Sequence, residues 1–162
     1  MNLVVKMKTL KIILIIVSIF LLDRFTKILI ANNLNLGESL PVIKNFFNIT
    51  YVNNHGAAFG IMDGKVIFIV VVSVVILAYL IYEIRKEAHS KLITISISFV
   101  IGGLLGNLFD RIVYGYVIDF FDFNFFGYDF AIFNVGDSFI VIGTILLAIG
   151  FLLEERNADK NK

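Results

Sequence analysis

The sequence has no cysteine and only two histidines among its 162 residues. Without cysteine the chain can form no disulfide, no thiolate nucleophile and no Cys-based metal site. His55 and His89 are far apart and outside the HExxH spacing, which argues against a zinc site. A formal net charge of +1 provides no basic stripe to neutralise phosphates, so we expect no nucleic-acid partner.

The sequence is also poor in charge. Only 17% of its residues are charged, whereas a soluble domain carries about a quarter. Hydrophobic residues make up 59%, and the mean hydropathy is +0.90. The membrane is therefore the expected solvent for most of the chain. We predict one domain over residues 1–162, an all-α polytopic membrane protein.

Long apolar stretches predict four membrane-spanning helices, over about residues 10–31, 66–82, 92–111 and 137–154. The first helix has to include Asp23, because the eleven apolar residues 12–22 are too few to cross ~30 Å of hydrocarbon. Small residues recur every four positions at Ser98, Gly102 and Gly106, which favours close approach of a neighbouring helix.

Two connections, 32–65 and 112–136, then lie on the same side of the membrane. Residues 41–52 are dense in aromatic and β-branched side chains, which predicts short strands or a β-hairpin on the membrane surface. The two connections hold only Lys44 and Lys65 of the fourteen basic residues, whereas the two ends and the 83–91 loop hold nine. By the positive-inside rule we expect both termini in the cytoplasm.

With this topology, polar residues from distant parts of the sequence collect near the outer leaflet boundary. Charge is expensive next to hydrocarbon, so such residues suggest a function. We predict that Asp119 and Asp137 form a carboxylate pair that shares one proton and titrates as a unit. The charged member can take a proton from water while the neutral member donates to an amide carbonyl oxygen.

The acidic residues also have structural interpretations. Asp137 precedes a hydrophobic run and can cap the fourth helix. Asp119 can be a surface turn residue, and Asp110 with Arg111 can form an ion pair that ends the third helix. Asp23 and Lys27 are spaced to pair on one helix face.

The remaining polar residues also have simpler interpretations. The three asparagines of these segments can satisfy buried backbone groups: Asn54, Asn107 and Asn134. Asp122 and Asp129 have the pattern of solvated loop charges, and we interpret His55 as a loop residue.

Five motifs in order resemble those of the bacterial lipoprotein signal peptidases, also called type II signal peptidases. The motifs are Asp23-Arg24-Phe25-Thr26-Lys27, Asn54-His55-Gly56-Ala57-Ala58-Phe59, Gly106-Asn107-Leu108-Phe109-Asp110-Arg111, Val117-Ile118-Asp119-Phe120 and Phe133-Asn134-Val135-Gly136-Asp137. In the last motif Gly136 stands where the family has alanine. One such motif is weak evidence, whereas five in order are highly specific.

The resemblance implies a four-helix membrane bundle with a small extracytoplasmic β-cradle from the first outer loop and a short interfacial helix in the second. It implies an aspartic endopeptidase with Asp119 and Asp137 as the catalytic dyad and no cofactor. The substrates are prolipoproteins whose cysteine carries diacylglycerol, and cleavage falls just before that cysteine. We expect a monomer among membrane lipids of the bacterial cytoplasmic membrane, with its active site at the outer leaflet.

The resemblance also implies roles for the residues around the dyad. Substrate and dyad are held by Asn54, Gly56, Asn107, Arg111 and Asn134. The fold around them is supported by Asp23, Lys27 and Asp110.

Three other functions deserve weighing. Tyr128-Asp129 and Gly136-Asp137 superficially match the motifs of presenilin-like proteases, but residue 134 is Asn rather than Gly, and four spans are too few. A serine mechanism at Ser138 lacks a neighbouring Lys or His base. The non-catalytic alternative is a small transporter or membrane assembly factor whose polar residues bind substrate or ions.

Overall fold

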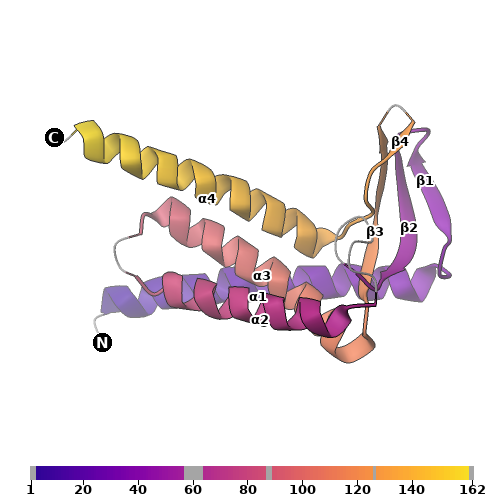
Figure 1. The fold of residues 1–162 in the computed structure, drawn as a ribbon, viewed down its shortest axis with the longest axis horizontal. Helices are drawn as coiled ribbons and strands as arrows, with labels where there is room; N and C mark the ends of the chain where they lie inside the picture. Colours follow the sequence, from indigo (N-terminus) through magenta and orange to yellow (C-terminus); the bar gives the residue numbers. More distant parts are fainter. Residues whose placement is uncertain (1–2, 57–63, 87–88, 126, 161–162) are drawn as a thin grey trace.

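The computed structural model describes residues 3–56, 64–86, 89–125 and 127–160. These residues form four helices, α1 (Leu3–Asn33), α2 (Val66–Glu83), α3 (Lys91–Tyr114) and α4 (Val135–Lys160), and four strands, β1 (Ser39–Ile43), β2 (Phe47–Asn54), β3 (Val117–Phe125) and β4 (Tyr128–Asp129). Both ends of the chain lie at one end of the helices, and the sheet lies at the opposite end (Figure 1).

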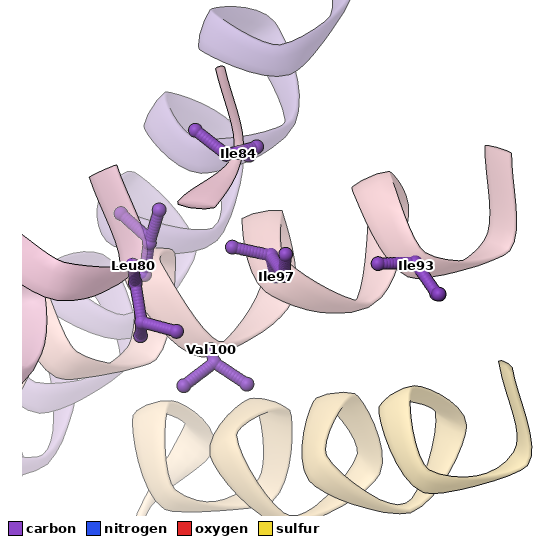
Figure 2. Close-up of a cluster of buried hydrophobic side chains, with 6 residues drawn as sticks. Leu80, Ile84, Ile93, Ile97 and Val100 are labelled. Atoms are coloured by element: carbon purple, nitrogen blue, oxygen red, sulfur yellow. The ribbon is translucent and has the colours of Figure 1, made fainter. Parts of the chain in front are cut away.

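Helix α3 is the central helix of the bundle and contacts each of the other three helices. Its N-terminal half contributes Ile93, Ile97 and Val100 to an apolar cluster, which Leu80 of α2 and Ile84, the residue after α2, complete (Figure 2). Ile93 and Ile97 are almost fully buried, at 0% and 1% exposure. Packing against three helices therefore holds α3 and the residues it carries in place.

Small residues allow the helices to approach α3 closely. Gly102 faces Ile19 of α1, and a side chain on Gly106 would overlap the carboxylate of Asp23. On the other side, Gly143 of α4 faces the backbone of Ser96. The predicted small-residue face on the third helix is confirmed, and it faces α1.

Three helices within the described residues are long and apolar enough to cross a membrane: α2, α3 and residues Val135–Asp159 of α4. Most side chains of α2 face outward, with Ile67 82% exposed, as expected for a helix surrounded by lipid. Helix α1 is long enough but carries Asp23, Arg24 and Lys27 in its second half. The chain is thus mostly helical, with three candidate membrane helices and a small antiparallel sheet.

The sheet has the order β1-β2-β3-β4, and its neighbouring strands are antiparallel. The predicted hairpin is confirmed as β1 and β2, with Pro41 on the edge strand, where its missing N–H is tolerated. Strand β3 continues the sheet from the second connection, placing Asp119 opposite Val52 and Phe123 opposite Phe47.

The expectation of a short helix in the second connection is wrong for the described residues 112–125 and 127–136. Those residues continue α3, form β3 and β4, and then begin α4. The reason is side-chain packing on the sheet. Phe123 stacks on Phe47 with ring centroids 4.5 Å apart and on Phe133 at 5.7 Å. Aromatic pairs of this kind stabilise strands, and pairing with β2 satisfies the backbone of β3.

The third helix is also longer than predicted, because it ends at Tyr114 instead of residue 111. Gly115 caps it in the left-handed conformation, with φ of 78°, and its N–H donates to the carbonyl oxygen of Arg111. Arg111 consequently lies in the last helical turn, where its side chain projects from a rigid element.

Candidate active site

Asp119 lies on β3 with a side chain that is almost completely buried, at 2% exposure. Its Oδ2 accepts a hydrogen bond from Asn54 Nδ2 at 2.8 Å, and its Oδ1 accepts one from Asn134 Nδ2 at 2.6 Å. The interpretation of Asp119 as a surface turn residue is therefore wrong. Asn54 lies on β2 and Asp119 on β3, and the antiparallel pairing of these two strands brings the two side chains together.

Asp137 lies in the first turn of α4 and takes part in the cap of that helix. The N–H of Asp137 donates to Asn134 Oδ1 at 2.9 Å, and the N–H of Asn134 donates to Asp137 Oδ2 at 3.2 Å. This reciprocal pair is a capping box. The capping interpretation of Asp137 is confirmed, and its Oδ1 remains available to accept from Asn107 Nδ2 at 2.7 Å.

Asparagine side chains link the two carboxylates. Asn134 Nδ2 donates to Asn107 Oδ1 at 3.1 Å as well as to Asp119, and Asn107 in turn donates to Asp137. The prediction that these asparagines satisfy backbone groups holds for Asn54, whose Oδ1 accepts from the N–H of Gly56 at 2.9 Å, and for Asn134, whose Oδ1 accepts from the N–H of Asp137. Each of the four carboxylate oxygens of Asp119 and Asp137 thus receives a hydrogen bond.

Both aspartates line one cavity of about 510 Å³ between α3, α4, β3 and the chain that precedes α4. Its polar lining also includes Asn54, Asn107 and Arg111. The rest of the lining is largely apolar: Val117, Phe130, Ala131, Ile132, Phe133, Ile140, Val141 and Ile142, with Ser138 among them. A mostly apolar pocket with a few convergent polar groups is typical of a binding or active site.

Arg111 reaches across this cavity from the end of α3. One terminal nitrogen donates to the carbonyl oxygen of Gly56 at 3.0 Å, and the Nε has no partner among the described residues. The suggested ion pair of Asp110 with Arg111 is wrong, because adjacent residues on a helix point in different directions. Asp110 instead contacts Arg24 and Lys27.

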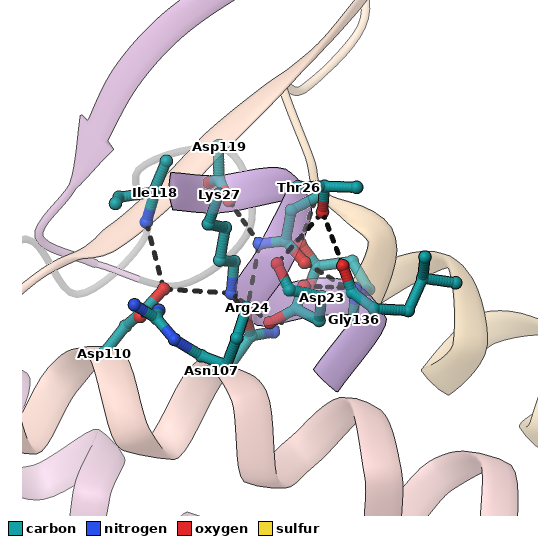
Figure 3. A network of polar contacts seen from close by, with 12 residues as sticks. Asp23, Arg24, Thr26, Lys27, Asn107, Asp110, Ile118, Asp119 and Gly136 are labelled. Carbon is teal, nitrogen blue, oxygen red and sulfur yellow. Dashed lines mark hydrogen bonds and ion pairs between the residues drawn. The ribbon is translucent and has the colours of Figure 1, made fainter. Parts of the chain in front are cut away.

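A buried network of charges lies next to Asn107 and Asp119, two of the residues that line the cavity (Figure 3). Lys27 Nζ lies 2.7 Å from Asp23 Oδ2, 2.9 Å from Asp110 Oδ2 and 2.8 Å from Asn107 Oδ1. The predicted pairing of Asp23 with Lys27 is confirmed, and neither side chain has exposed surface. Arg24 completes the network by its contact with Asp110.

Burial, and after it the negative charge of Asp137, raise the pKa of the Asp119 carboxyl from its ordinary value to about 7. Hydrogen bonds from Asn54 and Asn134 and the positive charge of Lys27 act in the opposite direction. A carboxyl with a pKa near neutrality can be protonated at rest while its neighbour is ionised, which is the condition for acid and base catalysis by one pair.

The sequence model of the family "Signal peptidase (SPase) II" matches residues 15–153. A lipoprotein signal peptidase of Caldanaerobacter subterraneus subsp. tengcongensis is 47% identical over 141 residues, which cover 87% of this chain and 94% of the relative. One from Staphylococcus aureus (strain JH9) is 44% identical over 151 residues, 93% of each chain. The chain belongs to the lipoprotein signal peptidase family.

Two solved structures, both described as bacterial membrane enzymes, agree with this membership. One is 42% identical with a TM-score of 0.84 and covers 91% of this chain and 90% of the other. The second is 43% identical with a TM-score of 0.79, and it covers 88% of this chain and 92% of the other. Family and apolar helices together identify the chain as a peptidase family member embedded in a bacterial membrane.

In this family member, several polar residues differ from their sequence-based interpretation. Asp122 is part of β3 and accepts from the hydroxyl of Thr50 at 2.6 Å, so it is no loop charge. The Ser138 hydroxyl donates to the carbonyl oxygen of Asn134 at 2.9 Å, the bond typical of a helical serine. Residues 57–59 of the second motif and the side chain of Asp129 lie outside the described part of the chain.

Sequence reasoning missed two contributors to the polar network. Arg24 contacts Asp110 and donates to the Tyr114 hydroxyl at 3.2 Å, with its guanidinium carbon 4.6 Å from the centre of the Phe109 ring. Its position beside Asp23 in the first motif was the available signal. The contact of Asp23 with the backbone of Gly136 had no such signal, because 113 residues separate the two.

Proposed function

We propose that this signal peptidase is a membrane-embedded aspartic endopeptidase that removes signal peptides from diacylglyceryl-modified prolipoproteins. In this proposal Asp119 and Asp137 are the catalytic dyad, and the bond cleaved is the one just before the lipidated cysteine. The observation that carries the proposal is that both carboxylates are held by asparagines against one partly apolar cavity.

The charges of the dyad support a general acid–base mechanism. The ionised carboxylate takes a proton from a water molecule, whose oxygen attacks the peptide carbonyl carbon. The protonated carboxyl donates to the carbonyl oxygen, giving a neutral tetrahedral diol. Collapse of the diol breaks the C–N bond: the protonated carboxyl donates its proton to the leaving nitrogen while the other carboxylate takes a hydroxyl proton from the diol, so that one proton is again shared between the carboxyls.

The neighbouring residues have supporting parts in this proposal. Asn54, Asn107 and Asn134 aim N–H groups at the carboxylate oxygens and hold them in place. Arg111 lines the same cavity, and its guanidinium is a donor for a substrate carbonyl or lipid oxygen. Gly56 is held by Arg111 and by Asn54, so these contacts tie the end of β2 to the site.

The arrangement of the helices supports a particular placement in the membrane. We propose that α1 is the fourth span, because its charged residues Asp23 and Lys27 are fully buried against α3 and do not face lipid. Both chain ends lie opposite the sheet (Figure 1), and the basic residues near them favour the cytoplasm. The dyad then lies at the outer leaflet, where the acyl chains of a lipidated substrate would also be.

The dyad is tested by precursor processing with purified protein and a diacylglyceryl-modified peptide. We expect Asp119→Asn and Asp137→Asn each to lower the cleavage rate by at least ~10³-fold, because one shared acid–base pair is lost. Asp122→Asn is the matched control, since it removes a carboxyl from the same strand outside the cavity. Substantial turnover by both dyad variants would reject the mechanism and favour a transporter or assembly factor.

Membrane orientation is tested by cysteine labelling, for which the cysteine-free chain needs no prior substitutions. Lys44 and Arg156 are exposed and lie at opposite ends of the molecule. We expect a membrane-impermeant maleimide to label Lys44→Cys in intact cells and Arg156→Cys only after permeabilisation. The reverse pattern would show that the proposed orientation is inverted.

A further inference from the structure

One buried lysine connects the supports of both catalytic aspartates. Lys27 Nζ bridges Asp23 Oδ2, at 2.7 Å, and Asp110 Oδ2, at 2.9 Å. Each of these carboxylates accepts a hydrogen bond from the backbone directly before one member of the dyad. Asp23 Oδ1 accepts from the N–H of Gly136 at 2.7 Å, and Asp110 Oδ2 accepts from the N–H of Ile118 at 3.4 Å.

A third contact leads from the same lysine directly to the dyad. Lys27 Nζ donates to Asn107 Oδ1 at 2.8 Å, and Asn107 Nδ2 donates to Asp137 Oδ1 at 2.7 Å. Because an ammonium has donors only, the amide oxygen of Asn107 must face Lys27. Its NH₂ group is then turned towards Asp137. The contacts of Lys27 thus reach Asp137 from two sides and Asp119 from one.

The network is electrically balanced without the dyad. Asp23 and Asp110 carry two negative charges, and Lys27 and Arg24 carry two positive charges, all four being buried. Ions in so dry a site are tolerated only with good geometry on each partner, which makes the arrangement stiff. Arg24 contacts Asp110 and the Tyr114 hydroxyl, so among the described residues it is Lys27 that joins the supports of both aspartates.

On the basis of the proposed aspartic mechanism, we propose that Lys27 is a positioning residue that sets the separation and orientation of Asp119 and Asp137. It touches neither substrate nor carboxylate of the dyad and acts through Asp23, Asp110 and Asn107. A misplacement of about 1 Å at a reacting group costs on the order of 10²-fold in rate, so loss of this bridge reduces the chemical step strongly.

The test compares Lys27→Met with Arg24→Gln, which removes the same charge from the same network. Both proteins are assayed in nanodiscs with the lipidated peptide, and rates are expressed per folded molecule. We expect Lys27→Met to lose about 10²-fold in kcat with little change in KM, and Arg24→Gln to lose much less. Equal losses in the two variants, or a wild-type kcat in Lys27→Met, would overturn the positioning role.

The pH profile provides a readout that a merely structural role would not move. Asp119 is faced by Asp137 from α4, Arg111 from α3 and Lys27 from α1. Lys27 lowers the pKa of the Asp119 carboxyl, so its removal raises that pKa. We expect the alkaline limb of kcat to move to higher pH in Lys27→Met and to stay in place in Arg24→Gln. An unmoved limb in Lys27→Met contradicts the proposal.

Two further measurements cover the case in which Lys27→Met does not fold. Adding Asp23→Asn restores neutrality and keeps an acceptor for Gly136, so we expect folding with kcat still low, and full recovery of kcat would overturn the proposal. In the wild-type protein, solid-state NMR should detect dipolar coupling of the Lys27 ammonium to both supporting carboxyl carbons, those of Asp23 and Asp110. Absent couplings would also overturn it.

A failure of the positioning role of Lys27 can be told apart from a failure of the catalytic role proposed for Asp119 and Asp137. Cleavage by Asp119→Asn rejects the aspartic mechanism, whatever Lys27 does. An inactive Asp119→Asn together with wild-type kinetics in Lys27→Met rejects the positioning role alone.

Discussion

The two halves of α3 are packed by different chemistry. The N-terminal half, with Ile93 and Ile97, contacts α2 and α4 through apolar side chains. The C-terminal half carries Asn107, Asp110 and Arg111 and contacts α1 and the sheet through hydrogen bonds and ion pairs. The apolar half holds the helices together without directional bonds, whereas the polar half places individual atoms. One helix thereby provides both a scaffold and a site.

Of the substitutions that test this difference between the two halves of α3, we expect Asp23→Ala at the polar half to have the largest effect. It leaves Lys27 short of a buried counter-charge and frees the N–H of Gly136, and breaking a buried pair costs about 3–5 kcal/mol. We expect the protein level in membranes and the thermal midpoint to fall, with a smaller loss in the rate of the molecules that fold. Immunoblots and thermal scans measure the first two. Normal protein levels combined with a lost chemical rate would reverse this assignment.

The pH dependence of cleavage tests the protonation of Asp119, which lies next to the polar half of α3. The pKa of Asp119 is raised to about 7, mainly by burial, so the carboxyl holds its proton below that pH and loses it above. Because the mechanism needs one protonated carboxyl, we expect kcat to fall up to ~10-fold per pH unit well above pH 7. A pH–rate profile of the purified protein measures this. A rate that still rises steadily from pH 7 to pH 9 would contradict it.

The smallest expected effect is at the apolar half, in Ile97→Ala. In a bilayer the Ile97 side chain stays in hydrocarbon even when the helices separate, so the substitution removes packing contacts but little hydrophobic transfer energy. We expect the free energy of unfolding to fall by about 1–2 kcal/mol. We expect a modestly lower thermal midpoint, with the kcat and pH profile of folded molecules unchanged. Ile67→Ala is the matched control, because Ile67 faces outward on α2. A shifted pH profile in Ile97→Ala would show that the two halves are coupled.

Much of the fold was predictable from patterns along the chain. Apolar length predicted the helices around Val66–Glu83 and Lys91–Tyr114, and β-branched and aromatic density predicted the hairpin of β1 and β2. The strand β3 was missed, because its alternation of phenylalanine with Asp and Asn suits a membrane interface as well as a strand. Only the presence of β2 as a neighbour decides between the two.

Parts of the site were predictable for a different reason. Asp119, Asp137 and the three asparagines stand in motifs whose residue types already suggest acid–base chemistry. The partners of Asp110 were predicted incorrectly, since sequence adjacency favoured Arg111 while helix geometry turns the two side chains apart. Arg24 was overlooked as a member of the network: its place in the first motif signals a role, but the sequence does not show which residues face it.

The sequence by itself determined that the chain is a membrane protein with polar motifs confined to the ends of its apolar segments, because hydrocarbon excludes unpaired charge and backbone. It also determined which residue types are available for acid–base work. Tertiary structure alone decided which of the buried ions pair and that Asp23 supports Gly136 from 113 residues away. Such contacts depend on how three helices and a sheet converge, and that convergence comes from packing over the whole molecule, which no local pattern contains.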